Sequence, residues 1–231
     1  MTDTILTLGF SSFRIDETYY INFLLWYSPI ILVQAVLGIG IYKHFCSASV
    51  YYFTRIKRRW TWWVKECMSL LGKVIILEII YVVVTNLIAY FTSDYYVNKA
   101  GLVLCIYFLL IFSLWTFIVT CTINVVSIVV NSHKAFSLCI LAQLVLIIAL
   151  LPYADVEQEH ELSIKLNPMA NLIIYWHSSR IEIVNRYIDN FGFKFDLNWT
   201  VAYYLILMII VVVAGGIVVS KKQFISSAAE G

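Results

Sequence analysis

AGLVLCIYFLLIFSLWTFIVTCTINVVSIVV, residues 100–130, runs for 31 positions without a charged side chain. A helix rises about 1.5 Å per residue and the hydrocarbon core of a bilayer is about 30 Å thick, so about 20 apolar residues cross it. The stretch therefore predicts a membrane-spanning helix, long enough to tilt or to break near Asn124.

The rest of the chain is similarly apolar. Of its 231 residues, 61% are hydrophobic and only 13% are charged, about half the charged share of a soluble domain. The β-branched run near the C-terminus would favour strands in water, but a lone strand in lipid leaves its backbone unpaired. We therefore predict an all-α integral membrane protein, a single transmembrane domain over 1–231. Its five spans lie near 20–42, 71–91, 100–130, 135–154 and 200–220.

The distribution of basic residues predicts the orientation. They gather in 43–66, in the turn 131–134 and after residue 220, which places these segments in the cytoplasm. The N-terminus, the loop 92–99 and the segment 155–199 then lie outside. This describes a multi-pass protein of the plasma membrane with its N-terminus outside and its C-terminus in the cytoplasm.

A sixth span would require the first nineteen residues to enter the membrane. Arg14, Asp16 and Glu17 argue against that crossing, and residues 5–13 would instead lie along the surface.

The segment YYFTRIKRRWTWWVKE, residues 51–66, combines clustered bases with three tryptophans. On a helix its apolar and aromatic residues fall near one face and its bases on the others, which is typical of a helix in the membrane interface. We predict an amphipathic cytoplasmic helix over 47–63 that contacts anionic lipid or a cytosolic protein; the alternative is that the bases only fix topology. No nucleic-acid-binding module surrounds them, so no nucleic-acid partner is expected. The candidate docking residues are Arg55, Lys57, Arg58, Arg59 and Trp60.

The outer segment 155–199 contains residues that are typical of the start and the end of a helix. Asn167 can cap a helix with Pro168 in its first position, and Gly192 can end it. We predict one or two short extracellular helices here, on or dipping into the outer leaflet.

Polar residues inside the spans are the remaining candidate sites: Lys73, Glu78 and Asn124. Lys73 is near a span end and can snorkel. Glu78 either lines an interface or a water-filled path, or is a protonated or hydrogen-bonded carboxyl that locks two helices together. Asn124 is expected to bond between helices, as are Gln34, Asn86 and Gln143.

No phosphate loop, zinc-protease motif or nucleophile elbow occurs, so no catalytic, cofactor-binding or metal-binding residues are assigned. The chain is not expected to be an enzyme by itself. An intramembrane enzyme would need paired polar groups at similar depth, and Glu78 has no such partner in the sequence.

Residues 55–84, which lead into the second predicted span, read RIKRRWTWWVKECMSLLGKVIILEIIYVVV. Together with the layout of the spans, this stretch resembles the membrane subunit of type-2 ABC exporters. Among these subunits, the chain most resembles the small permeases that export peptides and bacteriocins or give immunity to them. The resemblance covers residues 20–222. It rests on the layout of the spans and on the mixture of basic, aromatic and apolar residues over 55–80. It departs from the family pattern by one span, because such permeases usually have six spans with both ends inside.

The resemblance implies a permease subunit of an ATP-driven exporter, which moves an amphipathic peptide or a lipid-like substrate. ATP and magnesium would be bound by a separate cytosolic ATP-binding subunit, and none by this chain. A second permease chain, identical or related, would complete the path, and residues 47–63 would couple it to the ATPase. The alternative is a non-transporting membrane scaffold or accessory protein that recruits a cytosolic partner or anionic lipid.

Overall fold

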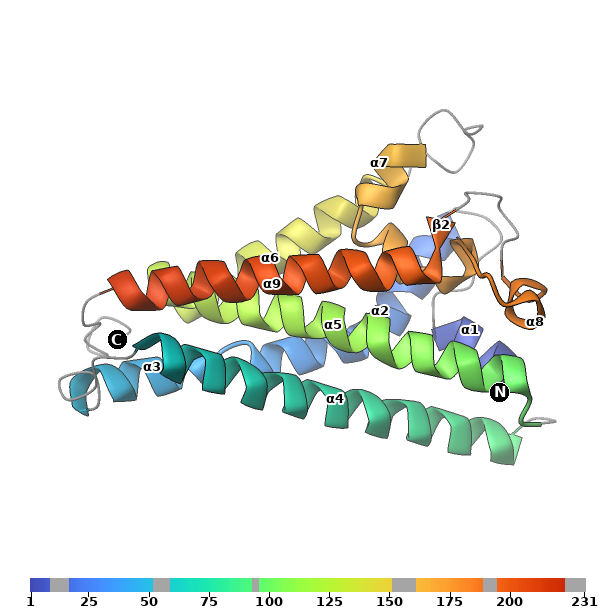
Figure 1. Ribbon diagram of the computed structural model, residues 1–231, viewed down its shortest axis with the longest axis horizontal. Coiled ribbons are helices and arrows are strands. Elements are labelled where there is room, and N and C mark those ends of the chain that lie inside the picture. The colour runs from blue at the N-terminus through green and yellow to red at the C-terminus, as the bar shows by residue number, and fades with distance from the viewer. Residues whose placement is uncertain (9–16, 52–58, 93–95, 151–160, 189–194, 223–231) are drawn as a thin grey trace.

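The computed structural model describes residues 1–8, 17–51, 59–92, 96–150, 161–188 and 195–222. Figure 1 shows long helices side by side, with the short elements near one end of the bundle. The long helices are α2 (Glu17–Leu37), α3 (Gly40–Tyr51), α4 (Arg59–Thr92), α5 (Lys99–Val129), α6 (Ser132–Ile148) and α9 (Leu197–Lys221).

The short elements lie at the N-terminus and between α6 and α9. They are α1 (Thr2–Leu8), α7 (Glu161–Leu166), the 3-10 turns η2 (Ala170–Leu172) and η3 (Ile174–Trp176), β1 (His177–Ser178), α8 (Glu182–Asn185) and β2 (Phe195–Asp196). The two strands pair in parallel, with His177 opposite Phe195 and Ser178 opposite Asp196.

Helix α5 is the centre of the bundle. It packs against α1, α2, α3, α4, α6, α8 and α9, and its residues 111–121 are all buried. A helix that is apolar all round is stable in this position, because each of its faces meets another helix. The predicted helix over 100–130 is confirmed and runs without a break past Asn124.

In the described part of the chain, four helical stretches are long and apolar enough to cross a bilayer: 27–47, 59–92, 99–129 and 197–221. The fold is therefore that of an all-α membrane protein, and the β-branched run near the C-terminus is helical as predicted. The fifth predicted span, 135–154, falls on α6, whose 17 residues span only about 25 Å. Five spans thus stay a prediction.

The bundle has two distinct ends. Figure 1 places the end of α3, the start of α4, the start of α6 and the end of α9 together, so the basic segments share one end as predicted. At the opposite end, the N-terminal amine donates to the Tyr96 carbonyl across 3.3 Å and the Thr2 hydroxyl donates to Asn98 Oδ1 across 2.7 Å. Which end faces the cytoplasm stays a prediction.

Helix α1 is part of the core. Ile5 and Leu8 are buried, and α1 packs against α5 and α4. The interpretation that residues from Ile5 onward lie along the membrane surface is therefore wrong for α1, because its apolar side chains fill space between helices. The remaining residues of that stretch, 9–13, lie outside the described part of the chain.

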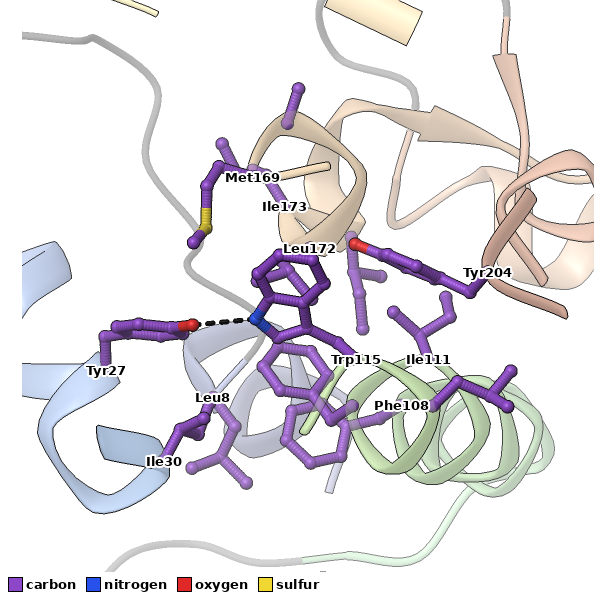
Figure 2. Close-up of a cluster of buried hydrophobic side chains, with 14 of the residues drawn as sticks. Leu8, Tyr27, Ile30, Phe108, Ile111, Trp115, Met169, Leu172, Ile173 and Tyr204 are labelled. Atoms are coloured by element: carbon purple, nitrogen blue, oxygen red, sulfur yellow. Dashed lines mark hydrogen bonds between the residues drawn. The ribbon is translucent and has the colours of Figure 1, made fainter. Parts of the chain in front are cut away.

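Trp115 joins the middle of the bundle to the segment between α6 and α9. Figure 2 shows its ring beside Tyr27 of α2, Tyr204 of α9 and the turn that carries Met169 and Ile173. The segment after α6 is therefore continuous with the helical core.

Candidate docking surface and intramembrane polar sites

The first turn of α4 holds the described members of the predicted docking group. The Arg59 guanidinium donates a hydrogen bond to the Lys222 carbonyl, just beyond the end of α9, across 2.7 Å. The Trp60 ring lies against Gly216 of α9, where a Cβ would overlap it, and Trp60 stays 43% exposed. The other predicted docking residues, Arg55, Lys57 and Arg58, lie outside the described residues. The basic segment thus leads directly into a helix that is attached to α9.

Trp63 fixes the same two helices one turn further along. Its ring is fully buried and its indole N–H donates to the Val212 carbonyl of α9 across 2.8 Å. The ring fits because Gly215 has no side chain, and a Cβ there would overlap Trp63. A buried indole whose N–H is satisfied and whose ring fills a glycine gap is a strong connection between helices.

A second connection joins α3 to α4. His44 Nδ1 lies 3.1 Å from Glu66 Oε2. The rings of Phe45 and Trp62 also pack, with centroids 6.1 Å apart. At the basic end of the molecule, α3, α4 and α9 are therefore tied together by polar and aromatic contacts.

In the described residues, the predicted amphipathic helix over 47–63 is divided between α3 and α4. Residues 47–51 end α3, and residues 59–63 begin α4. The apolar stripe that begins at Trp63 continues through Cys67, Leu70 and Val74 at a spacing of three or four, and no proline interrupts it. One helix of about 50 Å results, and this stripe packs against other helices instead of headgroups.

Asn124 closes a break in a neighbouring helix. Helix α2 ends at Leu37 and α3 begins at Gly40, which leaves backbone groups without helical partners. The Asn124 side chain accepts the Tyr42 N–H across 3.0 Å and donates to the Leu37 carbonyl across 3.1 Å. The break considered near Asn124 does not occur in α5, and Asn124 instead satisfies backbone groups at a break between α2 and α3. Its predicted bonding between helices is confirmed.

The two charged residues of the second span differ in their surroundings. Lys73 is exposed at the bundle surface. Glu78 is 3% exposed, and its Oε1 accepts a hydrogen bond from the Thr116 hydroxyl of α5 across 3.0 Å. Of the two interpretations of Glu78, the contact with Thr116 supports a carboxyl that joins two helices.

A polar cluster among α2, α5 and α6 adds residues that the sequence did not reveal. The amides of Gln34 and Gln143 exchange two hydrogen bonds of 3.1 Å, which confirms their expected role. The Tyr27 hydroxyl donates to Gln143 Oε1 and accepts from Trp115 Nε1 across 2.7 Å. Tyr27 and Trp115 were missed because an aromatic residue in an apolar run gives no sign that its polar atom is used. Asn86, by contrast, donates to Val82 of its own helix.

The outer segment differs from its prediction. Asn167 does cap a turn, since its Oδ1 accepts the Met169 N–H across 2.8 Å. The 3-10 turns η2 and η3 and the four-residue helix α8 follow, so the helical structure is in shorter pieces than predicted. Residues 169–177 are buried inside the protein. The Asn171 amide donates to the carbonyls of Lys165 and Asn167, which stabilises a tight fold of the chain that sequence periodicity does not encode.

His177 is a buried titratable residue of this segment. Its Nδ1 lies 2.9 Å from the Ile173 carbonyl and its Nε2 lies 2.7 Å from the Thr200 hydroxyl of α9. Thr200 Oγ1 is also 2.8 Å from Asn171 Oδ1, so the single hydroxyl proton serves one acceptor at a time. Burial lowers the pKa of His177 to about 4. The sequence indicated only that this histidine lies outside the spans.

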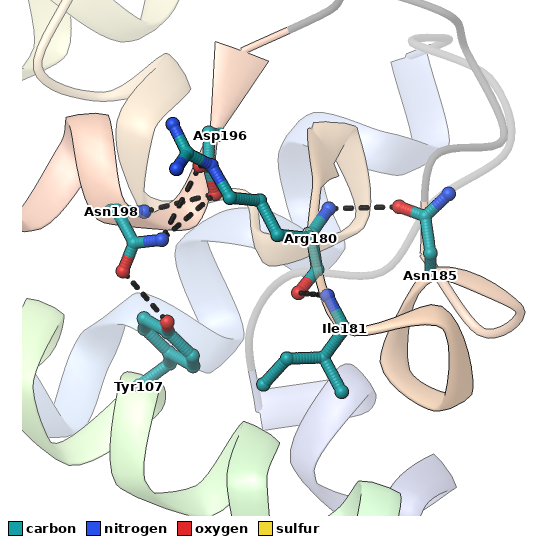
Figure 3. Close-up of polar contacts among 7 residues, drawn as sticks. Tyr107, Arg180, Ile181, Asn185, Asp196 and Asn198 are labelled. Carbon is teal, nitrogen blue, oxygen red and sulfur yellow. Dashed lines mark hydrogen bonds and ion pairs between the residues drawn. The ribbon is translucent and has the colours of Figure 1, made fainter.

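A more exposed polar group ties the same segment to α5 and α9. Figure 3 shows Arg180 reaching Asp196, with an Nε–Oδ2 distance of 3.3 Å. The Asn198 amide lies beside Asp196, and its Oδ1 accepts the Tyr107 hydroxyl of α5 across 2.8 Å. These contacts and the His177 cluster position the start of α9.

Comparison with known proteins identifies no relative: no family model, no curated protein and no solved structure matches this chain.

Proposed function

We propose that this chain is the permease subunit of an ATP-driven exporter, with ATP hydrolysed by a separate cytosolic ATP-binding subunit that docks at the basic end. A second permease chain, identical or related, would complete the transport path. The cargo class that suits an apolar path is an amphipathic peptide or a lipid-like molecule, and the direction is export or self-protection.

The observation that carries the proposal is the attachment of the basic segment to the spans. Arg59 and Trp60 begin a helix that continues for 34 residues, and Trp63 fixes this helix to α9. Because a continuous helix moves as a rigid rod, a partner that displaced the segment 52–59 would also displace α4 and α9. Coupling of ATP hydrolysis to transport requires such a rigid connection between the docking element and the spans.

The break between α2 and α3 adds support. Leu37 and Gly40 border it, and Asn124 satisfies its backbone groups. A hydrogen-bonded break between two helices is a natural hinge, since few backbone bonds change when it bends. The contact between His44 and Glu66 connects α3 to α4. When α4 moves, the first predicted span can therefore bend at this break and move with it.

The second permease chain has an available surface on α4. Large apolar side chains cover its outward face, among them Ile76, Ile80 and Leu87, each at least half exposed. In a bilayer this face meets lipid or another apolar helix. The proposal assigns it to the lipid and to the second permease chain.

The test begins with the full-length chain, affinity-tagged and crosslinked in the cells that produce it. Mass spectrometry should identify an ATPase with a phosphate loop, and that ATPase should hydrolyse ATP faster in the presence of this chain. The double variant Arg58→Glu/Arg59→Glu should remove the stimulation while membrane insertion is retained. Lys134→Glu, which reverses a charge at the same end but in a different turn, is the matched control and should keep it.

Full stimulation by the double variant would contradict the docking assignment. Recovery of a cytosolic partner without ATPase activity, or binding only to vesicles of anionic lipid, would instead favour the scaffold function. The basic residues account for that alternative equally well, because they attract any anionic surface.

A further inference from the structure

A small cavity lies beside Glu78, between α2 and α4. Its volume is about 50 Å³, and it is lined by Pro29, Ile30 and Val33 of α2 and by Leu77, Glu78 and Tyr81 of α4. Pro29 lies inside α2 and has no backbone N–H to donate to the carbonyl of Leu25. Ser28 Oγ donates to that carbonyl across 2.7 Å, so the proline is accommodated where the cavity forms.

The Glu78 carboxyl has one hydrogen-bond partner among the described residues. Thr116 donates to Oε1, while Oε2 has no partner in the described part of the chain. Glu78 is 19 positions after Arg59 and 14 before Thr92, so it lies about 20 Å or more from either end of α4. An acidic side chain is thus held deep in the bundle, next to a space large enough for a water molecule.

No described basic side chain neutralises this carboxyl. Lys73, the nearest cation in the sequence, is five positions away, about 140° around the helix, and is exposed. The titratable groups that interact electrostatically with Glu78 are the phenols of Tyr27 on α2 and Tyr81 on α4, which are neutral when protonated. From α5, the Thr116 hydroxyl faces it. An ionised carboxylate here would be a buried charge without a counter-ion, which costs several kcal/mol.

We propose that Glu78 and its cavity form a reversible proton-binding site, which holds the carboxyl in its neutral acid form and exchanges the proton through water in the cavity. Metal cations are poor alternatives because they need several oxygen ligands. Among the described residues at the cavity, the one side-chain oxygen bonded to the Glu78 carboxyl is that of Thr116. The proton resides on Oε2, the oxygen that Thr116 does not contact. Release gives a carboxylate on Glu78 and a proton on water, so charge balances without another reactant.

Proton release would act on the helix packing. A carboxylate at this position recruits water or moves toward it, and both changes separate α4 from α2 at Pro29. The site does not depend on an ATPase partner, so it stands or falls separately from the proposed function.

Infrared spectroscopy of the full chain in detergent tests the proposal, because a protonated carboxylic acid has a C=O stretching band that a carboxylate lacks. At about pH 7 the exposed carboxyls are ionised. We expect one carboxylic acid band that is absent from Glu78→Gln, moves on transfer to D₂O, and disappears at alkaline pH while the helical signal is retained. Thr116→Val should shift the band, because Oε1 loses its hydrogen bond. Thr120→Val, whose hydroxyl bonds carbonyls of its own helix, is the matched control and should leave the band unchanged.

Two results would overturn the proposal. Absence of the band from the folded wild-type protein would show that the carboxyl is ionised. A band that persists unchanged in D₂O and at alkaline pH would show a sealed carboxyl with a purely structural role. If Glu78→Gln fails to fold, the shift in Thr116→Val identifies the band instead.

Discussion

His177 makes the stability of the outer segment dependent on pH. Its pKa is about 4 in the folded protein and about 6.5 in an unfolded chain. Above about pH 6.5 both states are neutral at this residue. As the pH falls toward 4, the unfolded chain binds a proton that the folded protein does not, so the free energy of unfolding decreases by about 3 kcal/mol in total.

Thermal unfolding of the purified protein in detergent, at about pH 7 and about pH 5, measures this effect. The wild type should unfold at a lower temperature at the acidic pH, and His177→Gln should lose most of that difference. His133→Gln is the matched control, because His133 is exposed at the other end of the bundle. An equal acid shift in wild type and His177→Gln would contradict the assignment.

The contact between α4 and α9 depends on two adjacent glycines. Gly215→Ala should destabilise by about 1–3 kcal/mol, because its Cβ would overlap Trp63, which is fully buried and has no room to move. Gly216→Ala should cost less, since its Cβ meets the half-exposed Trp60, which can rotate.

Gly72→Ala is the control for helix propensity, because its Cβ would enter open space and should stabilise by up to about 1 kcal/mol. Midpoints of thermal unfolding in one detergent should rank Gly215→Ala lowest and Gly72→Ala highest. Equal losses for Gly215→Ala and Gly216→Ala would contradict the expectation that the half-exposed Trp60 ring can rotate away while the buried Trp63 ring cannot.

Among the elements, the break between α2 and α3 depends most on one distant side chain. Asn124→Leu would leave the Leu37 carbonyl and the Tyr42 N–H without this partner in a buried position, at a cost of about 1–3 kcal/mol. Ser127→Ala is the matched control, since the Ser127 hydroxyl bonds only the Ile123 carbonyl of its own helix among the described residues. Thermal unfolding should separate the two variants by several degrees, and similar midpoints would argue against a role for Asn124 at the break.

The sequence predicts where helices run better than how they pack. Runs of apolar residues locate the long helices because lipid excludes unpaired backbone. The same runs are apolar on every face, so they do not reveal that α5 is central while α4 keeps an outward face. The exceptions are the polar residues Gln34, Asn124 and Gln143, whose bonding between helices was expected because lipid offers them no partner.

The segment between α6 and α9 was predicted least well. Apolar residues after Pro168 have approximate helical spacing, which favoured one or two surface helices. The structure instead buries residues 169–177, because Asn171 and His177 form their hydrogen bonds with backbone and with Thr200, far along the chain. Contacts of this kind depend on tertiary structure and leave no periodic signal.

At the scale of the whole molecule, charge distinguishes the two ends of the bundle. Arg59 begins α4, Lys134 lies in the first turn of α6 and Lys221 ends α9. Figure 1 places these helix ends together, whereas α1 and α8 lie toward the other end. By the positive-inside rule we predict that the basic end faces the cytoplasm. The proposed docking of an ATP-binding subunit depends on this orientation, as does the side of the membrane whose pH acts on His177.

Labelling of single cysteines in intact cells with a membrane-impermeant maleimide tests the orientation most directly. The native cysteines would first be replaced by serine or alanine. Arg180→Cys, at a side chain that is 88% exposed, should be labelled from outside, whereas Lys134→Cys should be labelled only after the membrane is permeabilised. Labelling of Lys134→Cys together with protection of Arg180→Cys in intact cells would contradict the account, because the basic end would then face away from any cytosolic ATPase.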